Sequence, residues 1–292
     1  MTQLTATLWS ELPRELHHEG EPSAWAKMTR PGQPVHSFLE AAFFDSNGNL
    51  WLSDVPYGRV FRVSPSGDWT LMHQIDGEPH AMRLAPDGRR IAVDHRHGLI
   101  ELTGETTFDI LSTGGPDPFL GLSDMTYGPD NSLWFTDSGR TSLSDPRGRV
   151  YRWTDGDLRR VLDCVPYSNG IAVSPDNAWV FVAATRANQV WKFSTRLPDT
   201  GAPMVGTYLH LSGGLGPDGL ACNALGWLAV AQAQAGRAYV FDALGDLIAD
   251  IRLPRGLWTT SVTFDPADPQ HLFIVDAQYG GVFTCNIPTP RT

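Results

Sequence analysis

The sequence has only three cysteines among its 292 residues. Cys164, Cys222 and Cys285 are far apart, odd in number and without a C-x-x-C pair, so they predict no disulfide framework. Cys222 and Cys285 fall inside expected strands, where a free thiol behaves as a small apolar side chain. This usage of cysteine favours a reducing, cytoplasmic environment.

Basic residues and long apolar runs are also scarce. The chain carries 22 Lys and Arg against 32 Asp and Glu, a net charge of -10, whereas phosphate contacts need a basic surface. We therefore expect no nucleic-acid partner. No apolar run is long enough to span a bilayer, and the first 20 residues lack the apolar core of a signal peptide. The expected protein is soluble and cytoplasmic, a monomer or small homo-oligomer without a membrane partner.

Several familiar catalytic motifs are missing. The sequence contains no G-x-S-x-G elbow, no phosphate-binding Walker loop and no H-E-x-x-H. Ser123 is followed by Asp124, but no orienting histidine follows from the spacing, so a serine nucleophile is not expected. The run from Asp94 to His97 alternates imidazoles, yet it lies at an expected turn without further ligands, and we predict that it faces solvent.

The sequence does contain a sixfold repeat. In each unit a polar residue begins an apolar segment, and a tight turn and a second apolar run follow. The polar starts are separated by 40, 43, 46, 49 and 42 residues; they are Glu40, His80, Ser123, Asn169, Asp218 and Thr260. Such a period, with hairpin turns inside each unit, is typical of a β-propeller. The sequence predicts an all-β, six-bladed β-propeller: a single domain over residues 1–292, with blades starting near residues 38, 80, 123, 169, 218 and 260.

Each unit has room for about four short strands. In the first unit the strands are expected over residues 38–45, 50–54, 59–64 and 69–75, separated by residue-plus-glycine pairs suited to hairpin turns. The sixth unit supplies only three, over 261–265, 271–277 and 281–287, which would leave an open edge. Residues 1–35 form a leader without a blade of its own. We therefore predict that an early strand around residues 6–11 closes the last blade.

In-phase positions of a radial repeat fall at one height around one axis, so the six polar starts should converge. Glu40 and Asp218 are carboxylates, while Asn169 and Ser123 offer neutral oxygens. Two carboxylates in a dry central pocket would repel each other unless a cation lies between them. Oxygen donors suit a hard divalent ion, Ca²⁺ first and Mg²⁺ or Mn²⁺ next. The alternative is that Asn169 and Asp218 are turn residues.

Glu40 argues for the shared site. Glutamate is a poor turn former, and this one is flanked by apolar residues over positions 38–44. A charge inside such a segment needs a partner.

Three segments resemble the gluconolactonase, regucalcin and luciferin-regenerating enzyme (SMP-30-like) superfamily, with bacterial drug-responsive lactonases as the nearest resemblance. They are FLEAAFF, YSNGIAVSPDNAWVFVA and GPDGLAC, at residues 38–44, 167–183 and 216–222. The resemblance runs from about residue 36 to the C-terminus. It implies a six-bladed propeller with one divalent cation on the axis, Ca²⁺ first, with Zn²⁺, Mn²⁺, Mg²⁺ or Fe²⁺ as alternatives. Carried over by position, Glu40, Asn169 and Asp218 would be metal ligands, and Asp218 would also transfer a proton.

One motif departs from the superfamily. Many members have Arg-x-Asn-Asp where this chain has Gly121-Leu122-Ser123-Asp124. The missing arginine binds substrate in the sugar-lactone enzymes, so the resemblance does not favour an aldonolactone here. Ser123 is expected to ligate the metal weakly or to hold a water on it. Asp124 is either a carboxylate behind the ligands, able to contact substrate, or a residue that faces away.

The remaining polar start residues and nearby aromatic residues are expected to shape the substrate pocket. His80 would hydrogen-bond substrate or shuttle a proton, unless it is an ordinary histidine of the tunnel wall. Thr260 and Trp258 would shape the pocket. If Phe119, Tyr167 and Trp258 lie on the same face, they would favour a less polar lactone.

The function predicted from these residues is that of a metal-dependent lactone hydrolase acting on a small-molecule lactone. The cation would polarise the carbonyl, and Asp218 would take a proton from water and return it to the leaving alkoxide. Two alternatives stay open. One is a phosphotriester or fluorophosphate hydrolase on the same site, and the other is a non-catalytic propeller that binds calcium or a small ligand.

Overall fold

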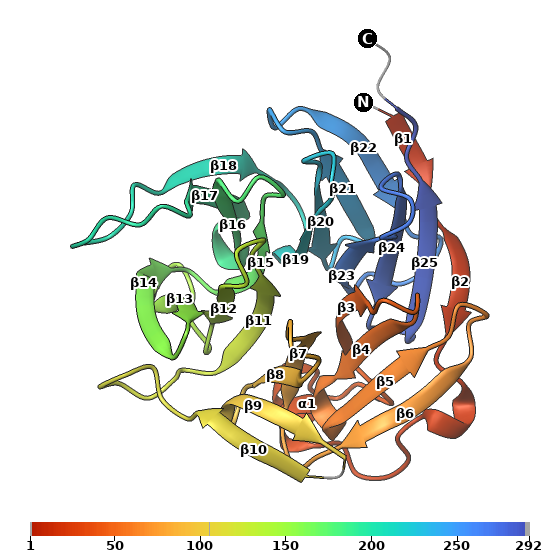
Figure 1. Ribbon diagram of the computed structural model, residues 1–292. Coiled ribbons are helices and arrows are strands. Elements are labelled where there is room, and N and C mark those ends of the chain that lie inside the picture. Colours follow the sequence, from red (N-terminus) through yellow and green to blue (C-terminus); the bar gives the residue numbers. More distant parts are fainter. Residues whose placement is uncertain (1, 105, 290–292) are drawn as a thin grey trace.

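Six sheets are arranged around one axis (Figure 1). The structure is a computed structural model and describes residues 2–104 and 106–289. In four sheets the strands follow one another in sequence from the axis outward, and the other two keep this order but carry an N-terminal strand at the outer edge. The six first strands contact one another around the ring. The predicted six-bladed β-propeller is confirmed.

The strands of the first three blades are listed from the axis outward. Blade 1 contains β3 (Leu39–Phe44), β4 (Leu50–Asp54), β5 (Arg59–Val63) and β6 (Trp69–Gln74). Blade 2 contains β7 (Pro79–Leu84), β8 (Arg90–Asp94), β9 (Gly98–Thr103) and β10 (Thr106–Leu111). Blade 3 contains β11 (Leu122–Tyr127), β12 (Leu133–Asp137), β13 (Gly148–Thr154) and β14 (Asp157–Val165).

The other three blades follow the same order. Blade 4 contains β15 (Ser168–Val173), β16 (Trp179–Ala184), β17 (Gln189–Ser194) and β18 (Gly206–His210). Blade 5 contains β19 (Gly216–Cys222), β20 (Leu228–Ala233), β21 (Arg237–Phe241) and β22 (Leu247–Arg252). Blade 6 contains β23 (Thr259–Phe264), β24 (His271–Asp276) and β25 (Gly281–Asn286).

The N-terminal segment closes the ring. Strand β2 (Thr7–Glu11) pairs antiparallel with β25 as the outer strand of blade 6, as the unfinished last repeat predicts. Strand β1 (Thr2–Thr5), which the sequence did not predict, pairs parallel with β22 and gives blade 5 a fifth strand. The leader therefore joins the last two blades (Figure 1).

The rest of the leader contains one short helix and one 3₁₀ turn. A short helix, α1 (Ala24–Thr29), begins at Ser23, whose side chain accepts a hydrogen bond from the backbone of Ala26. The 3₁₀ turns are η1 (Arg14–Leu16), η2 (Val55–Tyr57) and η3 (Thr185–Ala187). Among the described residues, no helix combines the length and apolar character that crossing a membrane requires.

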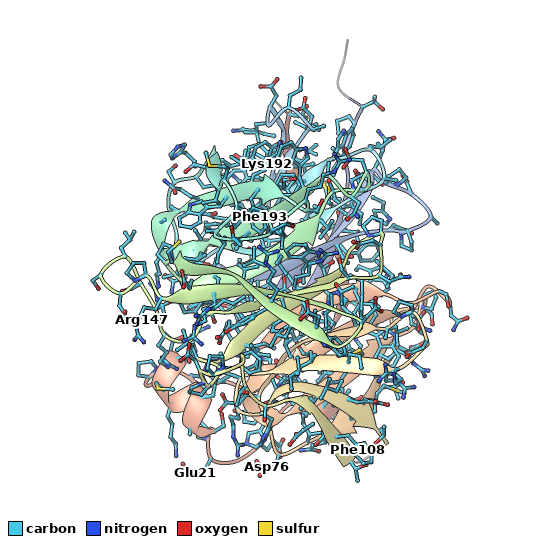
Figure 2. All side chains as sticks on the ribbon, turned by 60° about the vertical axis from the view of Figure 1, so that its left-hand side comes forward. Glu21, Asp76, Phe108, Arg147, Lys192 and Phe193 are labelled. Atoms are coloured by element: carbon cyan, nitrogen blue, oxygen red, sulfur yellow. The ribbon has the colours of Figure 1, made fainter. Side chains whose placement is uncertain are left out.

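The core lies between neighbouring blades, because each sheet packs on both faces. Successive residues of a strand point to opposite faces. In β17, Phe193 is buried against Trp134 of blade 3, whereas Lys192 lies over the rings of Trp179 and Tyr208 on the other face. Figure 2 shows both side chains over the sheets, with Glu21, Asp76, Phe108 and Arg147 at the periphery.

Every first strand carries a bulge at the position of its polar start. Bulges re-aim side chains and are common beside binding sites. Close packing of the inner strands explains one neighbouring glycine. A Cβ on Gly170 would overlap the backbone oxygen of Asp218, so only glycine fits after Asn169.

Candidate functional site

A cavity of ≈ 450 Å³ opens at the end of the axis where the six first strands begin. Glu40, His80, Asn169 and Asp218 line it together, so four of the six polar starts converge on one space. A second cavity, ≈ 350 Å³, lies at the opposite ends of the same strands. Its described lining includes Arg83 but no carboxylate. The first cavity is therefore the candidate site.

The other two polar starts lie in the wall behind the cavity. Ser123 is buried, and its Oγ donates a hydrogen bond to Asn169 Oδ1 at 3.0 Å. Thr260 is buried too, and its Oγ1 donates to the backbone oxygen of Leu39 at 2.7 Å. This hydroxyl joins blade 6 to blade 1, and Thr260 is not among the residues that line the cavity. Thr260 was expected to shape the pocket, but the structure places it behind the pocket wall.

Asp218 is buried and Glu40 is largely buried, with 13% of its side chain exposed, and neither has an Arg or Lys partner among the described ion pairs. The described hydrogen-bond partner of the Glu40 carboxylate is the imidazole of His80, with Nδ1 at 3.1 Å from Oε2. Burial, and then the negative charge of Asp124, raise the pKa of Glu40 to about 8. Burial, followed by the negative charges of Glu40 and Asp124, raises the pKa of Asp218 well above its usual range. A hydrogen bond from Asn169 acts in the opposite direction and lowers this pKa.

Asp124 lies behind these ligand candidates and is not at the cavity surface. Its carboxylate accepts hydrogen bonds from the backbone N–H groups of Met125 at 2.8 Å and Ile171 at 3.1 Å. The guanidinium of Arg83 approaches to 3.6 Å. Burial raises the pKa of Asp124, while Arg83 acts to lower it. Asp124 therefore lies behind the ligand candidates, as in the first of its two expected positions, but it does not line the cavity where a substrate would contact it.

The donor set fits a hard divalent cation. Glu40 and Asp218 supply carboxylate oxygens, Asn169 supplies an amide oxygen and Ser123 a hydroxyl beside it. Such oxygen donors suit calcium or magnesium. Within residues 2–104 and 106–289, no three His, Cys, Asp or Glu side chains are grouped to hold a metal, so a cation here would need the amide of Asn169. Burial raises both pKa values, and a cation between the two carboxylates would instead favour their charged forms.

One pocket residue was predicted wrongly. His95 does not face solvent: it lines the cavity, with its ring centroid 5.4 Å from that of His80. Its ring lies against the backbone of Gly121, where any Cβ would overlap it. His97 is exposed as expected, and its Nε2 contacts the backbone oxygen of Asp76 at 2.7 Å.

Aromatic residues also line the cavity. Phe38 packs between Trp25 and Trp258, with ring centroids at 4.9 Å and 5.5 Å, and all three line the cavity. Tyr167 lines it as well, and burial followed by Glu40 raises its pKa to about 12. Phe119 does not share this face; it packs against Phe135 and Tyr151 inside blade 3.

Besides supplying the strand that closes the ring, the leader also lines part of the cavity. Trp25, Met28 and Thr29 of α1 line the cavity, and Arg140 from the β12–β13 connection donates to Thr29 Oγ1 at 3.4 Å. On the other side, Arg30 lies over the ring of Trp258 at 4.6 Å. The helix therefore covers part of the cavity mouth.

The sequence model of the family described as "SMP-30/Gluconolactonase/LRE-like region" matches residues 39–278. The chain belongs to this family. Among curated relatives, lactonase drp35 of Staphylococcus epidermidis is 29% identical over 267 residues, which cover 84% of this chain and 79% of the relative. Lactonase drp35 of Staphylococcus aureus is 28% identical over 249 residues, covering 79% of this chain and 73% of that protein.

Solved structures of lower sequence identity share the fold. A gluconolactonase from Xanthomonas campestris has a TM-score of 0.74 at 23% identity, covering 86% of both chains. Regucalcin from Agrobacterium tumefaciens, a calcium-binding protein, has a TM-score of 0.70 at 21% identity, covering 97% of this chain and 96% of that one. The family match begins at residue 39, so α1 lies outside the matched region.

Proposed function

We propose that this chain is a divalent-metal-dependent hydrolase that opens a lactone ring. The observation that carries the proposal is the pair of carboxylates, Glu40 and Asp218, which share one cavity with Asn169 and whose pKa values are raised by burial. Arg140 and Arg186 line the same cavity, but no ion pair among the described residues joins either of them to these carboxylates. Membership of the family and the similarity to drp35 lactonases support the choice of a lactone as the substrate.

Glu40, Asn169 and Asp218 would hold the cation, with Ser123 binding it directly or through a water. We propose calcium, because every donor is a hard oxygen and because regucalcin, which shares the fold, is a calcium-binding protein. His80 holds Glu40 in place through the Nδ1 contact at 3.1 Å, and Ser123 does the same for the Asn169 amide at 3.0 Å. Such supporting hydrogen bonds orient the ligands of a metal.

When bound, the cation would polarise the lactone carbonyl and stabilise negative charge on its oxygen. The Asp218 carboxylate would take a proton from the attacking water as the new C–O bond forms at the carbonyl carbon. The ester C–O bond then breaks, and the same carboxylate returns the proton to the ring oxygen. The product is the open hydroxy acid. Trp25, Phe38 and Trp258 would keep bulk water away from this reaction.

The test is hydrolysis of a panel of γ- and δ-lactones by protein treated with a chelator and then supplied with Ca²⁺, Mg²⁺, Mn²⁺ or Zn²⁺. We expect turnover to disappear with the chelator and to return with one of these ions. Paraoxon and a fluorophosphate are included as rival substrates. Faster turnover of either one than of any lactone would reject the proposal, as would lactone hydrolysis that is indifferent to metal removal.

A further inference from the structure

One wall of the cavity is apolar, and the leader supplies part of it. Phe38, which precedes β3, packs between Trp25 of α1 and Trp258, which precedes β23, with ring centroids at 4.9 Å and 5.5 Å. Trp25 and Phe38 are buried, and Arg30, which follows α1, lies over the ring of Trp258 at 4.6 Å. These contacts hold α1 against blades 1 and 6, so this wall is formed before any ligand enters.

Apolar surface stays open on this wall. Met28 of α1 lines the cavity, yet 57% of it is exposed. Trp258 and Leu215 line the cavity as well and are only half-buried. A methionine side chain is flexible and polarisable, and it adapts its shape to an apolar ligand. Exposed apolar groups beside a pocket are typical of a site where a ligand covers them.

The cavity has more room than a bare lactone ring would use. Its volume, ≈ 450 Å³, is in the range of about 300–1,000 Å³ found for pockets that bury drug-sized ligands. With the carbonyl oxygen at the proposed cation, a substituent on the opposite side of the ring would extend away from the carboxylates into this room. Leu143 and Leu257, both exposed, each lie one residue along the chain from a residue of the lining. Apolar surface therefore continues beside the cavity, where a longer substituent would end.

Two arginines line the same cavity and would favour a different substituent, an anionic one. Arg140 Nη2 donates to Thr29 Oγ1 at 3.4 Å, and Arg186 lies over the ring of Tyr167 at 5.7 Å. Both arginines are exposed, so water solvates their charges without a ligand. The apolar surface of Met28, by contrast, is stabilised when a ligand removes it from water. The apolar wall is therefore the stronger reason for choosing a substituent, and an anionic group is the rival to test.

We propose that α1 and Trp258 form a subsite for an apolar substituent, so that the preferred substrate is a lactone with an alkyl chain. This inference rests on the proposed function and narrows it, because it names the class of lactone. A lactone with hydroxyl groups at that position would bury them against the thioether of Met28, a poor hydrogen-bond partner. Each methylene group of an alkyl chain would instead leave water for an apolar surface.

The experiment compares γ-butyrolactones whose γ-carbon bears an ethyl, a hydroxymethyl or a carboxylate group, three substituents of similar size. Each kcat/KM is divided by the rate constant for hydrolysis of the same lactone by hydroxide, which removes differences in intrinsic reactivity. We expect the ethyl compound to exceed the hydroxymethyl compound by about tenfold, and lengthening the chain to propyl and butyl to add about fourfold per methylene group. Equal values for the ethyl and hydroxymethyl compounds would overturn the proposal. So would a preference for the carboxylate, which would assign the subsite to the arginines.

Three variants test the part played by α1. Met28→Gln keeps the length of the side chain but replaces the thioether by an amide. We expect the preference for ethyl over hydroxymethyl to fall about fourfold, while kcat/KM for unsubstituted γ-butyrolactone is unchanged. Met28→Leu should retain the preference. Met204→Gln, the same change at a methionine that is 95% exposed and does not line the cavity, is the matched control. An unaltered preference in Met28→Gln, with its melting temperature unchanged, would contradict the role of α1.

A binding measurement separates this inference from the proposed function. The 5-ethyl and 5-hydroxymethyl derivatives of pyrrolidin-2-one are ring amides of similar size that need not be hydrolysed. In saturation-transfer NMR titrations with Ca²⁺ present, we expect tighter binding of the ethyl compound to wild type and Met28→Leu, and a smaller difference for Met28→Gln. Equal binding of the two compounds to wild type would overturn the subsite, even if lactones are hydrolysed. Tighter binding of the ethyl compound without hydrolysis of any lactone would reject the proposed function and leave the subsite standing.

Discussion

Two sets of buried carboxylates repeat around this propeller, and the groups that contact them differ. One set ends the second strands of four blades and consists of Asp54, Asp94, Asp137 and Asp276, all without exposed surface. The other set lies at the start of the first strands and consists of Glu40 and Asp218. Both sets come from in-phase positions of the repeat, so position alone does not separate them.

Hydrogen-bond partners do separate them. Each aspartate of the first set accepts at least one backbone N–H; Asp137, for example, accepts from Leu120 at 2.7 Å and Gly121 at 2.8 Å. These bonds limit the effect of burial, which raises the pKa of Asp137 to about 6. Burial takes Glu40 further, to about 8, because its described partner is a neutral imidazole. Backbone hydrogen bonds thus compensate the first set, whereas Glu40 and Asp218, the proposed ligand carboxylates, accept no described backbone hydrogen bond.

Asp218→Asn gives the largest expected effect. The amide cannot take a proton from water, so we expect kcat for lactone hydrolysis to fall about a thousandfold at saturating metal. The melting temperature of the metal-free protein should not fall, because the change removes a buried carboxylate that repels Glu40. Steady-state kinetics and calorimetry measure the two effects. Loss of folding with kcat intact would place Asp218 in the structural set.

Asp54→Ala should produce the opposite pattern. Asp54 accepts from the backbone of Phe38 and from Arg59 Nε, both at 2.6 Å, and its loss leaves the buried guanidinium without its anion. We expect the free energy of unfolding to fall by about 3 kcal/mol or more. The kcat of the remaining folded protein should be nearly unchanged. Denaturant unfolding measures the loss of stability, and kinetics normalised to the concentration of active sites measure kcat. A thousandfold loss of kcat would show that Asp54 does not differ in role from Asp218.

The pH dependence of stability should separate the sets further. Because the pKa of Glu40 is raised from 4.5 to about 8, the folded metal-free protein holds a proton that the unfolded chain releases above about pH 4.5. The free energy of unfolding should therefore fall as the pH rises from about 4.5 to about 8. Glu40→Gln or saturating Ca²⁺ should flatten this part of the profile. The same slope in Glu40→Gln as in wild type would contradict the assignment.

Ser123→Ala should have the smallest effect of the four. It removes the hydrogen bond to Asn169 Oδ1 at 3.0 Å without removing a carboxylate. We expect the affinity for Ca²⁺ to fall about tenfold, as for other groups that orient a ligand. Calorimetric titration measures this. If Ser123→Ala lowered the affinity for Ca²⁺ as much as Glu40→Gln does, Ser123 would instead be a direct metal ligand like Glu40.

Much of the fold could be predicted because the repeat carries the same local signals six times. The phase of the polar starts predicted that Glu40, His80, Asn169 and Asp218 meet, and they share a cavity. The missing fourth strand of the last unit predicted the pairing of β2 with β25. These conclusions depend on pattern and count, which a single sequence contains.

The parts that could not be predicted depend on contacts between distant segments. His95 belongs to a polar run that is typical of a turn, and it turns inward because Gly121 in the next blade leaves space for its ring. The six residues of α1 are too few to show helical periodicity, and the helix is stabilised by packing of Trp25 on Phe38. The hydroxyl of Thr260 is bonded to Leu39 in the next blade. No local sequence pattern predicts any of these contacts.

The pairing of β2 with β25 has a consequence for synthesis. Glu11 lies opposite Gly281, so β2 must wait for β25, which is synthesised 270 residues later. At about 5–20 residues per second, that wait is roughly 15 to 50 seconds. Until then the growing chain exposes strand edges that could pair with another molecule. Joining the two ends of the gene and opening it inside a blade would shorten the wait, and such a permuted chain should fold with less aggregation.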